Sequence, residues 1–137
     1  MAIYVVDTEN DIDYGFVKNL DPSVDEVIFF YSNKTRKISF ELIHYLTNSG
    51  IMYNFEFCNV GYPNALDFHI VVFVTNLISK NKFSELKLVI VSNDKGFGVA
   101  FNYLKSLEPN NCEIKYLRKN SCTPDIITLL NEHLEHL

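Results

Sequence analysis

Residues 87–101 read KLVIVSNDKGFGVAF, and this stretch decides the expected fold. A run of branched apolar residues (88–91) stops at a polar SND sequence (92–94), and apolar residues at helical spacing follow from Phe97. A short, fully apolar strand that ends in a polar loop and continues into a helix is half of a βαβ unit. Ligands bind at the carboxyl ends of such strands in open α/β sheets, so Asp94 stands where chemistry is expected.

The rest of the chain repeats this alternation of apolar strands and helical segments. Compact apolar segments bounded by polar turns predict strands over residues 2–6, 26–31, 52–58, 88–91 and 113–117. Apolar residues at helical spacing predict helices over residues 11–20, 34–49, 65–79 and 97–107, and Pro124 in the first turn of a last helix. Short loops between βα units favour a parallel sheet covered on both faces. We therefore expect an α/β fold in three layers, with about five parallel strands, in a single domain over residues 1–137.

Details of the pattern add more specific expectations. Residues 52–58 alternate between apolar and polar, as a strand near a sheet edge does. Gly50 is expected to end the helix before that strand. The apolar pattern of that helix consists of Ile38, Phe40, Leu42, Ile43, Tyr45 and Leu46. The helix over residues 65–79 is apolar on most faces, which predicts burial against the sheet.

Composition and charge limit the classes of protein to consider. With 47% hydrophobic and 21% charged residues, the chain has the composition of a soluble globular protein. The net charge of −5 argues against binding nucleic acid by bulk electrostatics, but an acidic metal site in a nucleic-acid enzyme contributes negative charge of this kind. The three cysteines have no zinc-type spacing and are expected to be reduced thiols. No signal-peptide pattern or membrane-span-length apolar run occurs, so we expect a cytoplasmic protein with no membrane partner.

Acidic side chains follow three of the predicted strands. Asp7 and Glu9 come after the first, Asp94 after the fourth, and Asp67 lies in the helix after the third, three residues past a candidate N-cap, Asn64. Each carboxylate alone would be read as a helix cap or loop residue. Together at one end of a parallel sheet, they would repel one another unless a cation or a shared proton neutralised them. Carboxylate and amide oxygens suit Mg²⁺ or Mn²⁺, and a metal held there can activate water for phosphodiester hydrolysis.

Four motifs strengthen this hypothesis through a family resemblance. In chain order they are VVDTEN (5–10), KISFELIHYL (37–46), NALDFHI (64–70) and VSNDKGF (91–97). The set resembles the PIN-like (NYN-related) domains of prokaryotes over nearly the whole chain, and NALDF followed by S-x-DKGF is its most specific part. The resemblance implies a Rossmann-like PIN fold and an Mg²⁺- or Mn²⁺-dependent nuclease, an endoribonuclease with RNA as the commoner substrate. It leaves a homodimer open.

The resemblance also implies roles for individual residues. Asp7, Asp67 and Asp94 match the catalytic metal carboxylates, with Glu9 as a less certain further ligand. Ser92 would orient its loop or contact phosphate. Asn10 and Asn64 would be supporting positions. Independently of the resemblance, the basic residues nearest these loops in sequence are candidate phosphate contacts: Lys34, Arg36, Lys37 and Lys95.

One departure from the family pattern keeps a second function open. Domains of this subtype often read DKGFD, whereas residue 98 is Gly. That difference would cost a metal ligand or leave a non-catalytic PIN-like module that binds RNA or a protein. A phospho-acceptor domain is a third reading, but it needs an Asp at the end of the third strand and a Lys after the last. Neither NVGYPN (59–64) nor LRKNSC (117–122) supplies these clearly.

Overall fold

A computed structural model describes residues 2–9, 12–35, 38–59, 65–80, 85–94, 97–107 and 112–117 of the chain. Its strands are β1 (Ala2–Asp7), β2 (Glu26–Tyr31), β3 (Met52–Phe57), β4 (Leu86–Val91) and β5 (Cys112–Leu117). Its helices are η1 (Tyr14–Asn19), a 3₁₀ helix, and the α-helices α1 (Phe40–Ser49), α2 (Ala65–Lys80) and α3 (Phe97–Ser106). The last predicted helix, after Pro124, lies outside the described residues.

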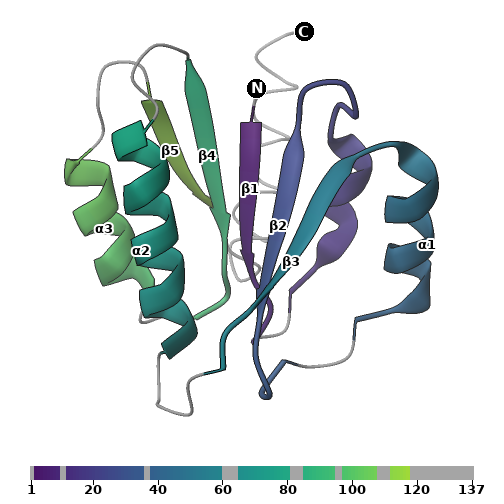
Figure 1. The fold of residues 1–137 in the computed structure, drawn as a ribbon, viewed down its shortest axis with the longest axis horizontal. Helices are drawn as coiled ribbons and strands as arrows, with labels where there is room; N and C mark the ends of the chain where they lie inside the picture. Colours follow the sequence, from purple (N-terminus) through teal and green to yellow (C-terminus); the bar gives the residue numbers. More distant parts are fainter. Residues whose placement is uncertain are drawn as a thin grey trace, which may run out of the picture.

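All five strands are parallel and form one sheet in the order β3-β2-β1-β4-β5. The sheet separates α2 and α3 on one face from η1 and α1 on the other (Figure 1). The predicted α/β fold in three layers is therefore confirmed, as is the place of the third strand at a sheet edge. The chain winds outward from β1 to β3, then returns to start again at β4. The strand order thus reverses between β1 and β4, which is where open α/β sheets bind their ligands.

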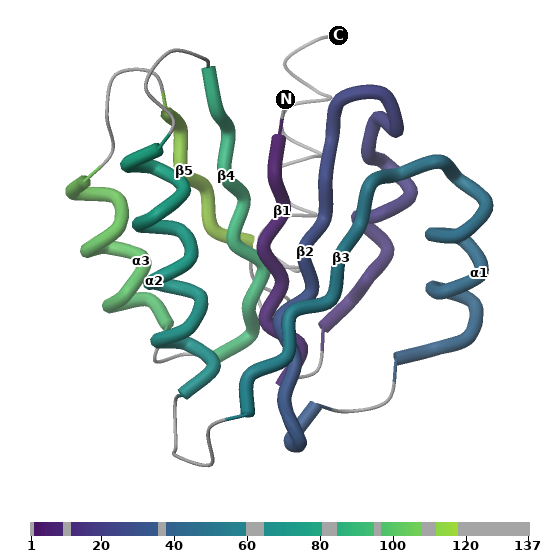
Figure 2. The backbone as a smooth tube through the Cα atoms, in the orientation of Figure 1, coloured from purple at the N-terminus to yellow at the C-terminus, as the bar shows by residue number. Residues whose placement is uncertain are grey.

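Two apolar cores lie on opposite faces of the sheet. Ile3 and Val5 of β1 pack with the buried positions of α2 and α3, whereas Val6 packs with those of η1 and α1. Successive side chains of a strand alternate between its faces. Asp7 therefore follows Ile3 and Val5 onto the face that α2 covers, at the carboxyl end of β1. Figure 2 shows β1 in the centre of the sheet, between β2 and β4.

The helix α1 begins later than predicted, at Phe40 rather than at residue 34. Ser39 caps it, because its Oγ accepts a hydrogen bond from the Leu42 N–H at 3.1 Å and its backbone is extended. Phe40 is the first helical residue and is 95% exposed. The expected end of the helix was right, since Gly50 has a φ of +80° and forms the left-handed C-cap.

Another helix also differs from expectation. The predicted helix over residues 11–20 is a shorter 3₁₀ helix, which Asp13 caps by accepting a hydrogen bond from the Gly15 N–H at 2.9 Å. The helix α2 has the expected extent and is buried against the sheet as predicted, while Phe68 and Val72 on its outer side are exposed. None of the helices in the described part of the chain is long and apolar enough to cross a lipid bilayer.

Candidate active site

The side chain of Asp7 is held by two hydrogen bonds at the end of β1. The pairing of Val6 with Val91 in the neighbouring strand brings Asp7 beside Ser92. The Ser92 hydroxyl donates to Asp7 Oδ2 at 2.8 Å, and the Glu9 backbone N–H donates to Oδ1 at 3.1 Å. Asp7 is 1% exposed and Ser92 is fully buried. Two donors thus fix the orientation of a buried carboxylate, as a positioned ligand requires.

The loop after β4 is fixed by bonds to its backbone. Ser92 Oγ also accepts a hydrogen bond from the Asp94 N–H at 3.2 Å, so this hydroxyl links the ends of β1 and β4. The Asp94 carbonyl accepts from the Phe97 N–H and from the Tyr116 hydroxyl, both at 3.1 Å. These contacts hold the loop between β4 and α3 against the neighbouring strand β5. Of the two roles predicted for Ser92, its burial and bonds favour orientation of the loop.

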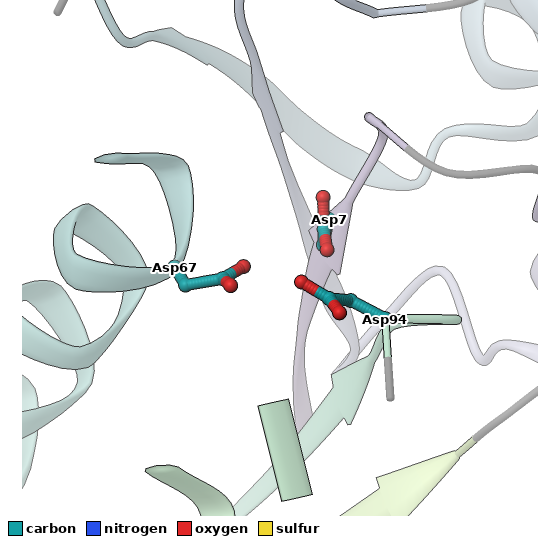
Figure 3. Close-up of side chains that lie close together, drawn as sticks. All are labelled: Asp7, Asp67 and Asp94. Carbon is teal, nitrogen blue, oxygen red and sulfur yellow. The ribbon is translucent and has the colours of Figure 1, made fainter. Parts of the chain in front are cut away.

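The third carboxylate comes from the first turn of α2. The buried residues of this helix, Leu66, Ile70 and Val74, pack on the sheet and fix its rotation. Asp67 follows Leu66 and points toward the end of β1 (Figure 3). The side chain of His69 is directed elsewhere and packs against the ring of Phe30, with ring centroids 5.3 Å apart.

Three carboxylates therefore converge from three separate elements. One oxygen from each of Asp7, Asp67 and Asp94 lies within 4.8 Å of the others, and Figure 3 shows the three groups facing a common point. Two unit charges at such separations repel by about 3 to 4 kcal/mol at an effective dielectric constant of about 20. Three negative charges in this space are unfavourable unless a proton or a cation neutralises part of them.

Burial and this repulsion raise the pKa values of the cluster. The pKa of Asp67 is raised to about 8, chiefly by burial, then by its hydrogen bond with Asp94 and by the charges of Asp7, Asp94 and Glu9. Burial also raises the pKa of Asp7, although the bonds from Ser92 and the Glu9 N–H oppose that change. At neutral pH the cluster without a cation therefore keeps a proton on Asp67.

Glu9 lies beside this group but is not one of its three members. Its carboxylate accepts a short hydrogen bond from Ser32 Oγ, at the end of β2. Its charge still raises the pKa values of Asp7 and Asp67. Its predicted role as a further metal ligand stays a prediction. Five other predicted positions lie outside the described residues: Asn10, Arg36, Lys37, Asn64 and Lys95.

Sequence reasoning missed two polar residues that position the site. Ser32 bonds to Glu9 and follows the strand next to β1, so the rule that found Asp7 could have found it. Tyr116 reaches the Asp94 carbonyl from β5, and no local pattern marks that contact because it depends on the order of the strands.

The donor set at this point fits a hard divalent cation. It consists of carboxylate oxygens from Asp7, Asp67 and Asp94, which are the ligands that Mg²⁺ and Mn²⁺ prefer. A cation would also remove the repulsion that keeps Asp67 protonated. Fold and site together define a class of protein: a doubly wound α/β domain with an acidic cluster where the strand order reverses.

Comparison with protein families shows which family within this class the chain belongs to. A family model described as PIN domain matches residues 1–111, and the chain belongs to that family. The resemblance to PIN-like domains is confirmed at this level, together with the PIN fold. PIN domains are generally nucleases that use divalent metals, so the family and the acidic cluster support a hydrolase of nucleic acids. Comparison with curated proteins and with solved structures gave no match.

Proposed function

We propose that this PIN domain is a metal-dependent endoribonuclease that hydrolyses phosphodiester bonds in single-stranded RNA. The observation that carries the proposal is the convergence of Asp7, Asp67 and Asp94 at the point where the strand order reverses. Loop carboxylates that served only as caps would have no reason to crowd at one point against their mutual repulsion. Membership of the PIN family supports the same chemistry.

In this proposal the three aspartates hold Mg²⁺ or Mn²⁺. The bound cation would supply positive charge for the scissile phosphate and a water of lowered pKa. Ser92 and the Glu9 N–H keep the Asp7 carboxylate in place, while the packing of α2 sets the position of Asp67. Because the three ligands come from β1, α2 and the loop after β4, the rigid sheet and helix set their spacing before substrate binds.

Cleavage assays test the proposal directly. Wild-type protein and the Asp94→Asn variant are incubated with Mn²⁺ and with linear and circular single-stranded RNA, and with DNA of the same sequence. We expect the wild type to cut both RNA forms, the circular one because an endonuclease needs no free end, and the variant to lose at least a hundredfold in rate, or about 2.7 kcal/mol of transition-state stabilisation. Equal rates in the two proteins, or no cleavage at any Mn²⁺ concentration, would refute the proposal.

Two further readouts separate the proposal from its rival. Calorimetric titration with Mn²⁺ shows whether Asp94→Asn removes metal binding, independently of activity. Binding of RNA by the wild type without cleavage, and with no binding of Mn²⁺, would instead identify a non-catalytic RNA-binding module. Preference for the DNA substrate would retain the nuclease and reject its assignment to RNA.

A further inference from the structure

An apolar groove lies between α2 and α3, next to the three carboxylates. The two helices lie side by side on one face of the sheet (Figure 2). Between them is a cavity of about 400 Å³, within the range of about 300 to 1,000 Å³ typical of small-ligand sites. Its lining is mostly apolar or aromatic and consists of Asp67, Phe68, Val71, Phe97, Val99, Ala100 and Tyr103.

The walls of this groove are unusual for a helix surface. Phe68 on α2 is 69% exposed, and Val99 and Tyr103 on α3 are 78% and 59% exposed. Phe97, in contrast, is fully buried and forms part of the core beneath them. Single exposed apolar residues are common, but several gathered around a cavity are characteristic of a binding site.

The position of Asp67 connects the groove to the candidate active site. This residue lines the cavity and also contributes one of the three converging carboxylates. Phe68 is its neighbour in sequence, and Val71 lies one turn further along α2 on a similar side. A ligand in the groove would therefore lie beside a phosphate held by a cation at the carboxylates.

We propose that this groove, between Phe68 and Tyr103, binds one base of the nucleic acid next to the phosphate that is cleaved. The proposal rests on the proposed nuclease function and adds the substrate feature that positions the strand. In a nucleotide, one sugar joins the base to its phosphate, so a base beside Phe68 can belong to a nucleotide whose phosphate lies at Asp67. Proteins that bind single strands combine contacts to the charged backbone with stacking of bases on aromatic rings, and in a chain with a net charge of −5 stacking gains in importance.

The groove further implies that the base must be unpaired. A base in a duplex is stacked between its neighbours and cannot enter a cavity lined by side chains of two helices unless it leaves the stack. Single-stranded RNA should therefore be cut faster than the same sequence in a duplex. Because any base offers a flat face for stacking, we expect only a modest preference for its identity.

A double-mutant cycle between protein and substrate tests this proposal. Cleavage in Mn²⁺ is measured for RNA in which one base at a time near the cut is replaced by an abasic site, with wild type, Phe68→Ala and Tyr103→Ala. At one position we expect base removal to lower kcat/KM of the wild type roughly tenfold, mainly through KM. Each variant should show a similar loss on intact RNA and little further loss on the abasic RNA.

The control variant is Phe40→Ala, which removes a 95% exposed phenylalanine from α1 on the opposite face of the sheet. It should behave like the wild type on every substrate. Additive losses at all positions, or no loss in the Phe68 and Tyr103 variants, would overturn the proposed base site while the nuclease stands. A wild-type dimer that Phe68→Ala dissociates, with additive effects on RNA, would identify the groove as a protein interface and also overturn it.

The same cycle can be measured without catalysis. Dissociation constants of fluorescently labelled RNA report base binding even if the wild type cleaves nothing. If base removal and loss of the aromatic ring have non-additive effects on the dissociation constant, base binding in the groove is supported, whatever the outcome for the nuclease. Additive effects on the dissociation constant at every position would reject base binding in the groove, independently of any cleavage result.

Discussion

At the scale of the residue, Asp67 controls the charge of the candidate site. It is the member of the cluster whose pKa lies at about 8, because burial, its bond with Asp94 and nearby negative charges all favour the protonated form. The Asp7 carboxylate is held by the Ser92 hydroxyl and the Glu9 N–H, whereas Asp94 is positioned through hydrogen bonds to its backbone. A single proton on Asp67 therefore competes with metal for the same site.

This competition predicts how the stability of the metal-free protein depends on pH. The folded-state pKa of Asp67, about 8, lies above its ordinary value of 3.8, so the folded protein binds more protons between these values. The stabilisation of the fold that this raised pKa of Asp67 provides is fully present below about pH 4 and is lost as the pH rises through about 8. In EDTA, the free energy of unfolding from urea titrations should fall from pH 5 to pH 8.

The variant Asp67→Asn is the control for this prediction. Its neutral amide cannot titrate, so the fall in stability should be smaller and the variant should exceed the wild type at pH 8. A gain on the order of 1 kcal/mol is expected, since contact with solvent screens part of the repulsion. A wild type and variant with parallel pH profiles would contradict the assigned pKa.

A second prediction concerns Ser92, whose hydroxyl bonds both Asp7 Oδ2 and the Asp94 N–H. Ser92→Ala would leave a buried carboxylate and an N–H group each without this partner. Chemical denaturation should show a loss of about 1 to 3 kcal/mol, and calorimetry should show weaker Mn²⁺ binding because the Asp7 pKa rises further.

Ser79→Ala provides the matched comparison. Ser79 is exposed near the end of α2, and its hydroxyl donates to the Asn76 carbonyl at 3.0 Å. Its removal should change stability by no more than about 0.5 kcal/mol and leave Mn²⁺ binding unchanged. If the two serine variants were equally mild, Ser92 would not position the site.

The residues of the site could be predicted because parallel strands gather their carboxyl ends at one edge. That rule pointed to Asp7 and Asp94, and to Asp67 in the helix that follows the third strand, and the family resemblance added weight to all three. Hydrogen-bond partners that lie on other strands could not be predicted in the same way. The bond between Tyr116 and the Asp94 carbonyl depends on β5 lying beside β4, which local sequence does not encode.

At the scale of the element, the start of α3 decides how many acids the site can hold. Gly98 is the second residue of this helix, one turn after Asp94. The DKGFD pattern that the family resemblance implies would place an Asp here. A Cβ built there would meet no atom within 4 Å, so the position accepts a side chain. The absence of an acid is thus not imposed by packing.

Substitutions at Gly98 separate its structural effect from its chemical one. Ala, Asn and Asp should all be accommodated, and Gly98→Ala should stabilise the protein by about 0.5 kcal/mol through helix propensity. Gly98→Asp should in addition bind Mn²⁺ severalfold more tightly, measured by calorimetry, because it adds a carboxylate near the cluster. Equal Mn²⁺ affinities for Gly98→Asp and Gly98→Asn would show that residue 98 does not reach the metal.

The elements themselves were predicted well where apolar periodicity is strong and less well at their ends. The helix α1 was predicted too long because its apolar pattern continues on the N-terminal side of Ser39. The capping hydrogen bond of Ser39 instead makes the helix begin at Phe40. The burial of α2 against the sheet was predicted correctly from its apolar residues. Which of these residues stay exposed, such as Phe68 and Val72, only the tertiary packing of α2 reveals.

At the scale of the whole molecule, the site joins parts of the chain that are distant in sequence. Asp7, Asp67 and Asp94 belong to the central strand, a helix and a loop, so a shared cation would tie the two halves of the sheet together. Sequence periodicity predicted the parallel sheet with helices on both faces. It did not contain the strand order, which is what places β1 beside β4 and brings the carboxylates together.

Binding of Mn²⁺ should therefore stabilise the entire fold, and more strongly as the pH rises. At a concentration of about 100 times Kd, a ligand that binds only the folded state adds about 2.7 kcal/mol to the free energy of unfolding, or a rise in Tm on the order of 10 °C for a chain of this size.

The cation binds the deprotonated Asp67, so its apparent affinity should increase up to about tenfold per pH unit until the pKa of about 8 is passed. Mn²⁺ should thus reverse the loss of stability that EDTA-treated protein shows between pH 5 and pH 8. Thermal unfolding of wild type and Asp94→Asn at both pH values measures this, and a rise in Tm that is equal in the two proteins would show that the metal binds elsewhere.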